Sequence, residues 1–200
     1  VLMRRILYAA VAASLAFSAA AQAADTIDYN STPNDTWFYG DGNDYSPANT
    51  AVLTASDGGQ LYLRAHETFQ PAQASDGNGV YSFALGTDPL SFDWGFDRVA
   101  DAFLDIPTIT LTNLGTGASI FYPLIGSDNE SANGSTQNSA RLNWFPIGFN
   151  PNVSDMYKVS LKAMTQTGSP HELSIYAKIG DGITSAVPES ATWSLLLIGF

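Results

Sequence analysis

The stretch that decides the fold is residues 156–164, MYKVSLKAM, in which apolar and polar residues alternate. Successive side chains of an extended chain point to opposite faces, so this pattern predicts a β-strand with one buried face. Residues 172–179 repeat the alternation, and a glycine and a proline lie between the two stretches. We therefore predict an antiparallel hairpin closed by the loop Thr165–His171.

The same alternation recurs toward the N-terminus. In the stretch 61–66, Leu61, Leu63 and Ala65 share one face and Tyr62, Arg64 and His66 the other, which predicts a sheet packed on one side. Other predicted strands lie in Thr26–Asn49, Ala51–Thr54, Gly79–Leu85, Phe92–Asp97, Thr108–Thr112, Ser119–Leu124 and Arg141–Phe145. We expect surface loops at Gly126–Ser139 and Gly148–Asp155 and a short helical turn at Asp97–Leu104.

About nine short strands separated by turn residues are typical of an all-β fold. We predict an antiparallel two-sheet β-sandwich, with a jelly-roll-like arrangement as one alternative. The chain has 200 residues, of which 45% are hydrophobic and 12% aromatic, so it is large enough for one domain with a true core. The absence of cysteine excludes disulfides, zinc–thiolate sites and cysteine nucleophiles.

The charge balance limits the partners. The formal net charge is −11, with 8 Lys and Arg against 19 Asp and Glu. Nucleic-acid binding requires a basic surface, and an anionic membrane would repel the chain, so we expect neither as a partner. A neutral, cationic or sugar-like partner is compatible with this charge.

The N-terminus has the three parts of a secretory leader. Two arginines, Arg4 and Arg5, precede an apolar run that extends to about Ala20, and Ala21-Gln22-Ala23 follows. This order predicts a signal peptide over residues 1–23, cut by signal peptidase after Ala23. A membrane anchor is the alternative, but the run is shorter than the roughly 20 residues of a span. Cleavage removes two arginines and no acid, so the mature net charge is 6 − 19 = −13.

Few residues carry chemistry. His66 and His171 have no metal-ligand spacing, and we expect both to be polar residues on exposed strand faces or ends. Asp93, Asp97, Asp101 and Asp105 lie four residues apart. Two such carboxylates serve glycosidases as acid and nucleophile, but a solvated acidic face explains the same spacing and is our preferred interpretation. No nucleophile elbow, phosphate loop or dinucleotide fingerprint is present, so we predict a protein that is not an enzyme, with a glycan-active enzyme as the lesser alternative.

Two kinds of ligand remain open. Calcium prefers oxygen ligands, and two stretches of the sequence are candidate calcium sites. One contains Asp41, Asn43 and Asp44, and the other contains Asp128, Asn129 and Glu130. The preference of Asn and Asp for turns explains the same residues without a metal. No other cofactor is predicted. Aromatic side chains stack on sugar rings, and the candidates are Trp37 and Trp144, with Phe38, Tyr39 and Phe145 beside them, although such residues also build cores.

The C-terminal stretch resembles a known sorting signal. Residues 186–193, AVPESATW, are followed by the apolar run SLLLIGF. This order is similar to the PEP-CTERM signal of exported bacterial proteins, carried here by Val187, Pro188, Glu189 and Trp193, with Ser190 at the position of the second proline. The parts of the chain are then a passenger domain at 24–180, a linker at 181–186, and the sorting motif with the beginning of a membrane segment at 187–200.

The resemblance implies a route rather than an activity. An exosortase would cut near Pro188–Glu189 after transient anchoring in the inner membrane of a Gram-negative bacterium. The product would reach the cell surface or the extracellular polysaccharide matrix of a biofilm. We therefore expect a non-enzymatic exported protein, with a carbohydrate-binding module of the matrix as the alternative. Pro188 also opposes helix formation, which keeps the segment extended and accessible.

Overall fold

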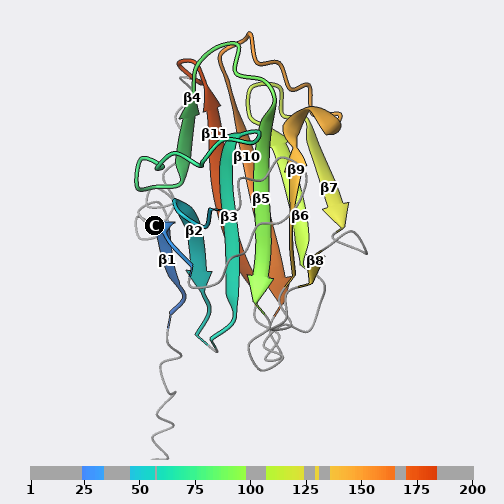
Figure 1. The fold of residues 1–200 in the computed structure, drawn as a ribbon. Coiled ribbons are helices and arrows are strands. Elements are labelled where there is room, and N and C mark those ends of the chain that lie inside the picture. Colours follow the sequence, from blue (N-terminus) through green and yellow to red (C-terminus); the bar gives the residue numbers. More distant parts are fainter. Residues whose placement is uncertain are drawn as a thin grey trace, which may run out of the picture.

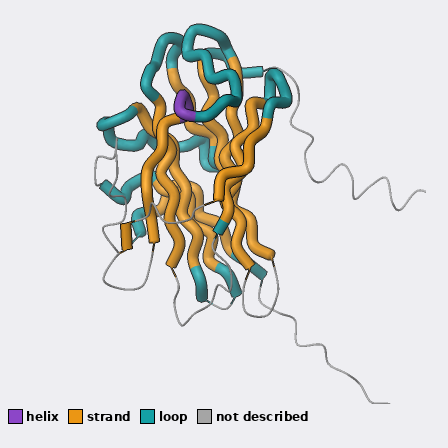
Figure 2. The backbone as a smooth tube through the Cα atoms, turned by 90° about the vertical axis from the view of Figure 1, so that its right-hand side faces the viewer, coloured by secondary structure: helices purple, strands orange, loops and turns teal. Residues whose placement is uncertain are grey.

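A computed structural model of the chain describes residues 24–33, 46–56, 58–97, 107–123, 129–130, 136–164 and 170–183. Within these ranges the chain folds into strands that form two sheets packed face to face (Figures 1 and 2). The helical residues in these ranges are limited to the 3₁₀ turn η2, Leu142–Trp144. The predicted all-β sandwich is therefore confirmed.

The first sheet has six strands in the order β1-β2-β3-β5-β9-β8, and neighbouring strands are antiparallel throughout. Their bounds are β1 Thr26–Ser31, β2 Thr50–Thr54, β3 Gln60–Glu67, β5 Leu90–Asp97, β9 Thr136–Arg141 and β8 Asn129–Glu130.

The second sheet has five strands in the order β4-β11-β10-β6-β7. Their bounds are β4 Val80–Phe83, β11 Pro170–Ile179, β10 Asp155–Met164, β6 Thr108–Asn113 and β7 Ser119–Pro123. The pair β11–β4 is parallel, while the other pairs of this sheet are antiparallel. The fold is thus largely, but not entirely, antiparallel.

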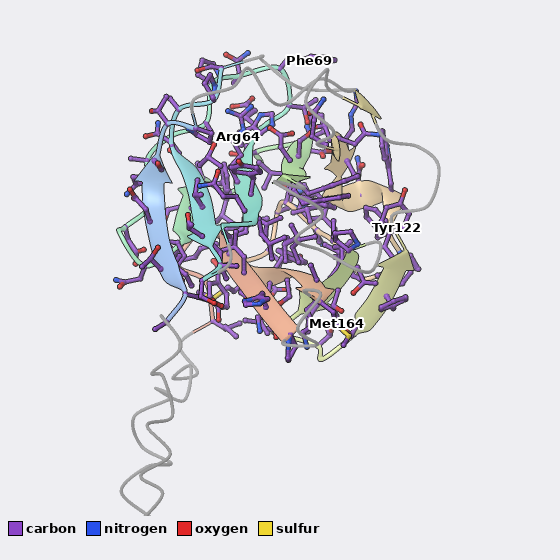
Figure 3. The ribbon with its side chains drawn as sticks, turned by 90° about the horizontal axis from the view of Figure 1, so that it is seen from below. Arg64, Phe69, Tyr122 and Met164 are labelled. Atoms are coloured by element: carbon purple, nitrogen blue, oxygen red, sulfur yellow. The ribbon has the colours of Figure 1, made fainter. Side chains whose placement is uncertain are left out.

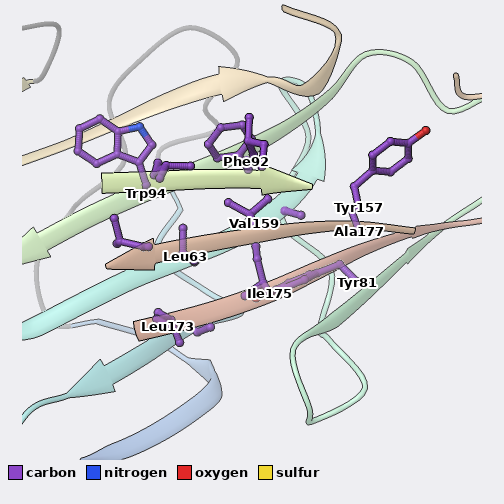
Figure 4. Close-up of a cluster of buried hydrophobic side chains, with 14 of the residues drawn as sticks. Leu63, Tyr81, Phe92, Trp94, Tyr157, Val159, Leu173, Ile175 and Ala177 are labelled. Atoms are coloured by element: carbon purple, nitrogen blue, oxygen red, sulfur yellow. The ribbon is translucent and has the colours of Figure 1, made fainter. Parts of the chain in front are cut away.

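The core lies between the sheets, where the predicted apolar faces meet (Figure 4). Phe92 and Trp94 of β5 and Val159 of β10 are at most 1% exposed. Burial of such side chains is the main favourable contribution to folding in a chain without disulfides. The predicted hairpin is also confirmed, because β10 and β11 pair in one continuous antiparallel register from Asp155↔Ile179 to Met164↔Pro170.

Two local predictions are wrong. The stretch Gly126–Ser139, expected to be a loop, contains β8 and most of β9. The strand expected at Arg141–Phe145 instead begins at Thr136, ends at Arg141 and continues into η2. The sequence of β9 is TQNSAR, which has no apolar alternation, because its buried outward residues Gln137 and Ser139 are polar. The predicted turn segment from Gly148 is confirmed up to Ser154, after which β10 begins.

The two outer faces of the sandwich differ. On the six-stranded sheet, the outward residues Arg64, His66, Ser91, Asp93 and Gln137 are all 0% exposed. The expectation that His66 and Asp93 face solvent is therefore wrong. The outward residues of the five-stranded sheet are mostly half-buried or exposed, so this is the open face.

Candidate functional site

A cleft is lined by residues of β9 from the first sheet and of β7 from the second. Figure 1 shows these two strands on the same side of the molecule. The volume of the cleft is about 430 Å³. The lining residues are Trp94, Tyr122, Asn138, Ser139, Ala140, Trp144 and Phe145. They come from β5, β7, β9 and the η2 turn, so residues far apart in sequence form one concave surface.

Aromatic contacts fix the walls of the cleft. Tyr122 and Phe145 meet edge to face, with ring centroids 5.4 Å apart, and Phe145 also packs against Phe92 of the core at 5.9 Å. Figure 3, which views the molecule from below, shows Tyr122 at the β7 side of the sandwich. Such ring pairs prefer defined geometries, so the wall on this side is anchored to the core.

Trp144 stands at the mouth of the cleft and is 51% exposed. The Arg141 guanidinium lies 5.5 Å from the Trp144 ring centroid and 5.7 Å from that of Phe69. Arg141 does not line the cleft, and its cation–π contact supports the indole of Trp144. The arrangement holds Trp144 in place while half of its surface remains accessible.

The polar groups of the cleft are neutral. Asn138 Oδ1 accepts a hydrogen bond from the Ser139 backbone N–H at 2.7 Å, which orients the amide. Tyr122 adds a phenol group, and none of the lining residues carries a charge. A few placed polar groups in an otherwise apolar cavity are typical of small-molecule and sugar sites. The cleft can therefore hold an uncharged ring by stacking and orient it by hydrogen bonds.

A second feature is a buried charged cluster on the outer face of the six-stranded sheet, formed by Arg64, His66, Asp93 and Ser139. Arg64 Nε lies 2.6 Å and His66 Nε2 lies 3.0 Å from the same carboxylate oxygen, Oδ2 of Asp93. Ser139 Oγ donates to the other oxygen, Oδ1. The antiparallel register places Arg64 and Ser139 directly opposite Asp93 on its two flanking strands.

The surroundings of His66 favour its protonated form. Nδ1 lies 2.8 Å from the backbone carbonyl oxygen of Glu67, and Nε2 faces the Asp93 carboxylate. Both ring nitrogens therefore face acceptors, and only the imidazolium can donate to both. Burial opposes the charge, but the Asp93 carboxylate outweighs burial and raises the pKa of His66. For Asp93, burial also disfavours the charged form and so raises the pKa. The positive charges of His66 and Arg64 outweigh this effect and hold the pKa of Asp93 below its ordinary value.

The buried cluster decides the two interpretations of Asp93, which were a solvated acid and a catalytic carboxylate. Asp93 is fully buried and paired, so it is neither a solvated surface acid nor open to a substrate. Arg64 also donates to the backbone carbonyls of Ser46 and Ala48, so it ties that segment to this face of the sheet (Figure 3 labels Arg64). The side chain of Asp97, and Asp101 and Asp105 altogether, lie outside the described residues.

His171 also differs from its prediction as an exposed polar residue. It is 6% exposed, and its Nδ1 lies 2.6 Å from Asp25 Oδ2. The contact joins the segment preceding β1 to the beginning of β11, so it links the two sheets. Asp25, two residues after the predicted signal peptidase site, has its side chain in this contact.

Most other predicted site residues lie outside the described ranges. These are Ala21, Ala23, Trp37, Asp41, Asn43, Asp44, Asp128, Val187, Pro188, Glu189 and Trp193, and the side chain of Glu130 in β8 is likewise not described. Within the described ranges, no three His, Asp or Glu residues are grouped as a metal site would need. In those same ranges, no helix has the length and apolar character of a membrane span.

Among the predicted ligand-binding residues, the structure places Trp144 in a cleft. Its partners Tyr122, Asn138 and Arg141 were not predicted, because they come from separate strands and no local pattern joins them. Comparison of the sequence with protein-family models gives no match, and no curated protein matches it.

Proposed function

We propose that this chain is an exported, non-enzymatic β-sandwich protein that binds a neutral sugar chain in the cleft between β7 and β9. The observation that carries the sugar-binding part is the half-exposed Trp144 at the mouth of that cleft. The N-terminal leader pattern and the PEP-CTERM-like motif support export to the cell surface or the polysaccharide matrix.

The chemistry of the cleft supports a sugar more than a purely apolar ligand. One face of a pyranose ring is lined by C–H groups, which stack on an indole, while its hydroxyls need hydrogen-bond partners. Trp144 offers the stacking surface, and Asn138 and Tyr122 offer amide and phenol groups. The uncharged lining fits a neutral sugar, because an ionised group would be desolvated there without a counter-charge.

The binding proposal is tested with Trp144→Ala and Trp144→Phe in the full chain. Dextran, a cellulose oligosaccharide and a mixed-linkage β-glucan are the probes, and calorimetry or affinity electrophoresis measures retention. The alanine variant should lose binding and the phenylalanine variant should keep part of it, since only the latter retains a ring. Val153→Ala removes a 52% exposed apolar side chain outside the cleft and serves as the control.

Two results would contradict the binding proposal. One is the absence of binding to every neutral probe by the parent protein. The other is equal binding by the parent and Trp144→Ala, with both folded by circular dichroism. In either case the exposed indole has another role.

The export proposal is tested by mass spectrometry of both termini, with protein recovered separately from membranes and medium. We expect a mature start at Ala24 and, in the released protein, an end near Pro188–Glu189. Released protein that retains residues up to Phe200 would show that the C-terminal motif is not cut, and sorting by an exosortase would have to be abandoned.

A further inference from the structure

The outer face of the five-stranded sheet is open, because most of its outward side chains are half-buried or exposed, and its charge differs from that of the rest of the chain. We call it the lysine face and define it by the outward side chains of the five strands. These are Val80, Ser82, Thr108, Thr110, Thr112, Ser119, Phe121, Met156, Lys158, Ser160, Lys162, Met164, Pro170, Glu172, Ser174, Tyr176 and Lys178. On the opposite outer face, the outward residues Arg64, His66, Ser91, Asp93 and Gln137 of the central strands are buried, so the five-stranded sheet offers the broader open surface to a large partner.

The charge of the lysine face has the opposite sign to that of the whole chain. It carries three lysines and one glutamate, a local balance of 3 − 1 = +2, whereas the chain as a whole carries −11. After residue 23 the sequence has only six lysines and arginines, so half of them lie on this one face. A strongly acidic protein thus presents a local cationic surface.

The lysines follow one line along β10 and β11. Lys158 lies opposite Tyr176, so Lys178 is its diagonal neighbour, at about 7–8 Å. Lys162 is four residues further along β10, or about 13 Å away. Glu172 lies between the two, with its oxygens 3.6 Å from Lys158 Nζ and 3.0 Å from Lys162 Nζ. The backbone positions of the three lysines therefore extend over about 20 Å along the strands, while the ammonium groups of Lys158 and Lys162 converge on one carboxylate.

Hydroxyl groups fill the rest of the face in rows that cross the strands. One row contains Thr112 and Ser119, whose hydroxyl oxygens are 3.0 Å apart. The next contains Ser160 and Ser174, at 2.9 Å. Two aromatic rings flank these rows, Phe121 on β7, which is 60% exposed, and the half-buried Tyr176 on β11.

From this arrangement we infer that the lysine face binds an anionic polysaccharide. Carboxylates of the polymer pair with Lys158, Lys162 and Lys178, and its rings stack on Tyr176 or Phe121. Its hydroxyls meet the accessible hydroxyl groups of the rows, which are those of Thr110, Thr112, Ser119 and Ser174. This surface is separate from the neutral cleft and does not depend on it. A single protein could thereby hold two kinds of sugar chain.

The acidic character of the whole chain does not prevent this binding at physiological ionic strength. The screening length in 0.15 M salt is about 8 Å, so distant acids contribute little and the local lysines dominate. Exposed charge pairs are each weak, which means that affinity comes from several contacts along one polymer.

The test uses alginate as the anionic polysaccharide and dextran as the neutral one, with the full chain at 0.15 M salt. Lys158→Gln with Lys178→Gln should lower alginate affinity by about tenfold, since two exposed charge contacts are lost. Glu172→Gln should raise it by about threefold, because it releases two lysines from a competing carboxylate. Raising the salt to 1 M should abolish binding of the parent.

Two control variants distinguish alginate binding by the lysine face from an effect of total charge and from binding in the cleft. Asp28→Asn on the exposed strand β1 raises the net charge as much as Glu172→Gln but lies on the other sheet, so alginate affinity should not change. Trp144→Ala should also leave alginate binding unchanged. Equal gains from Asp28→Asn and Glu172→Gln would overturn the inference, as would salt-independent binding. Binding to vesicles of anionic phospholipid without binding to alginate would assign the face to a membrane and also overturn it.

Discussion

Replacing Asp93 with asparagine tests how the buried charged cluster stabilises the fold. The substitution preserves shape but leaves the buried Arg64 guanidinium without a carboxylate partner, and it leaves His66 facing a neutral amide. Breaking a buried ion pair by removing one partner costs about 3–5 kcal/mol. Because 1 kcal/mol shifts the melting temperature of a chain of this size by about 2–4 °C, we expect a decrease of roughly 6–20 °C.

The dependence of stability on pH gives a sharper criterion. In the parent, the folded pKa of His66 lies above its ordinary value of 6.5, so the folded state binds the proton more tightly. The stability it contributes is complete below pH 6.5 and is lost as the pH rises through the folded pKa. In Asp93→Asn, burial beside Arg64 lowers the pKa of His66, so stability should instead increase as the pH rises toward 6.5.

Urea unfolding between pH 5 and 9 measures both effects. One proton changes the free energy of unfolding by at most about 1.4 kcal/mol per pH unit. We expect this free energy to fall with pH above 6.5 in the parent and to rise with pH below 6.5 in Asp93→Asn. His66→Gln, which removes the titrating ring, supplies the baseline. The reasoning is refuted if Asp93→Asn unfolds within 1 kcal/mol of the parent and follows the same pH dependence.

Three further predictions concern the fold and its ligands. Ser139→Ala removes the donor to Asp93 Oδ1 and should cost about 1–3 kcal/mol in urea unfolding; an unchanged midpoint would contradict it. Gly79→Ala should lower the melting temperature, because Gly79 has φ +84° and a Cβ there would lie 2.6 Å from the Tyr29 ring; equal melting curves would show that the ring moves freely. If Asp41 or Asp128 helps to bind calcium, millimolar calcium should raise the melting temperature and chelator should lower it, and coincident curves would exclude a stabilising site.

The sequence by itself determined the strands that have one apolar face. In β10 and β11, alternate apolar residues leave only an extended conformation with a common buried side, and the short connection between them requires antiparallel pairing. Alternation is a local property, so it can be recognised without knowledge of the neighbours. For the same reason β9, which alternates between polar groups, was predicted as a loop.

Only the tertiary structure decided what the polar faces do. Arg64, His66 and Asp93 have the pattern of a solvated face, but all three are buried: the strand register places Arg64 opposite Asp93, and Arg64 also binds the backbone of the distant residue Ser46. The cleft at Trp144 and the line of lysines likewise depend on which strands become neighbours. Side-chain polarity fixes the face of a strand, whereas strand order and the cover provided by distant segments determine whether that face is core, binding site or open surface.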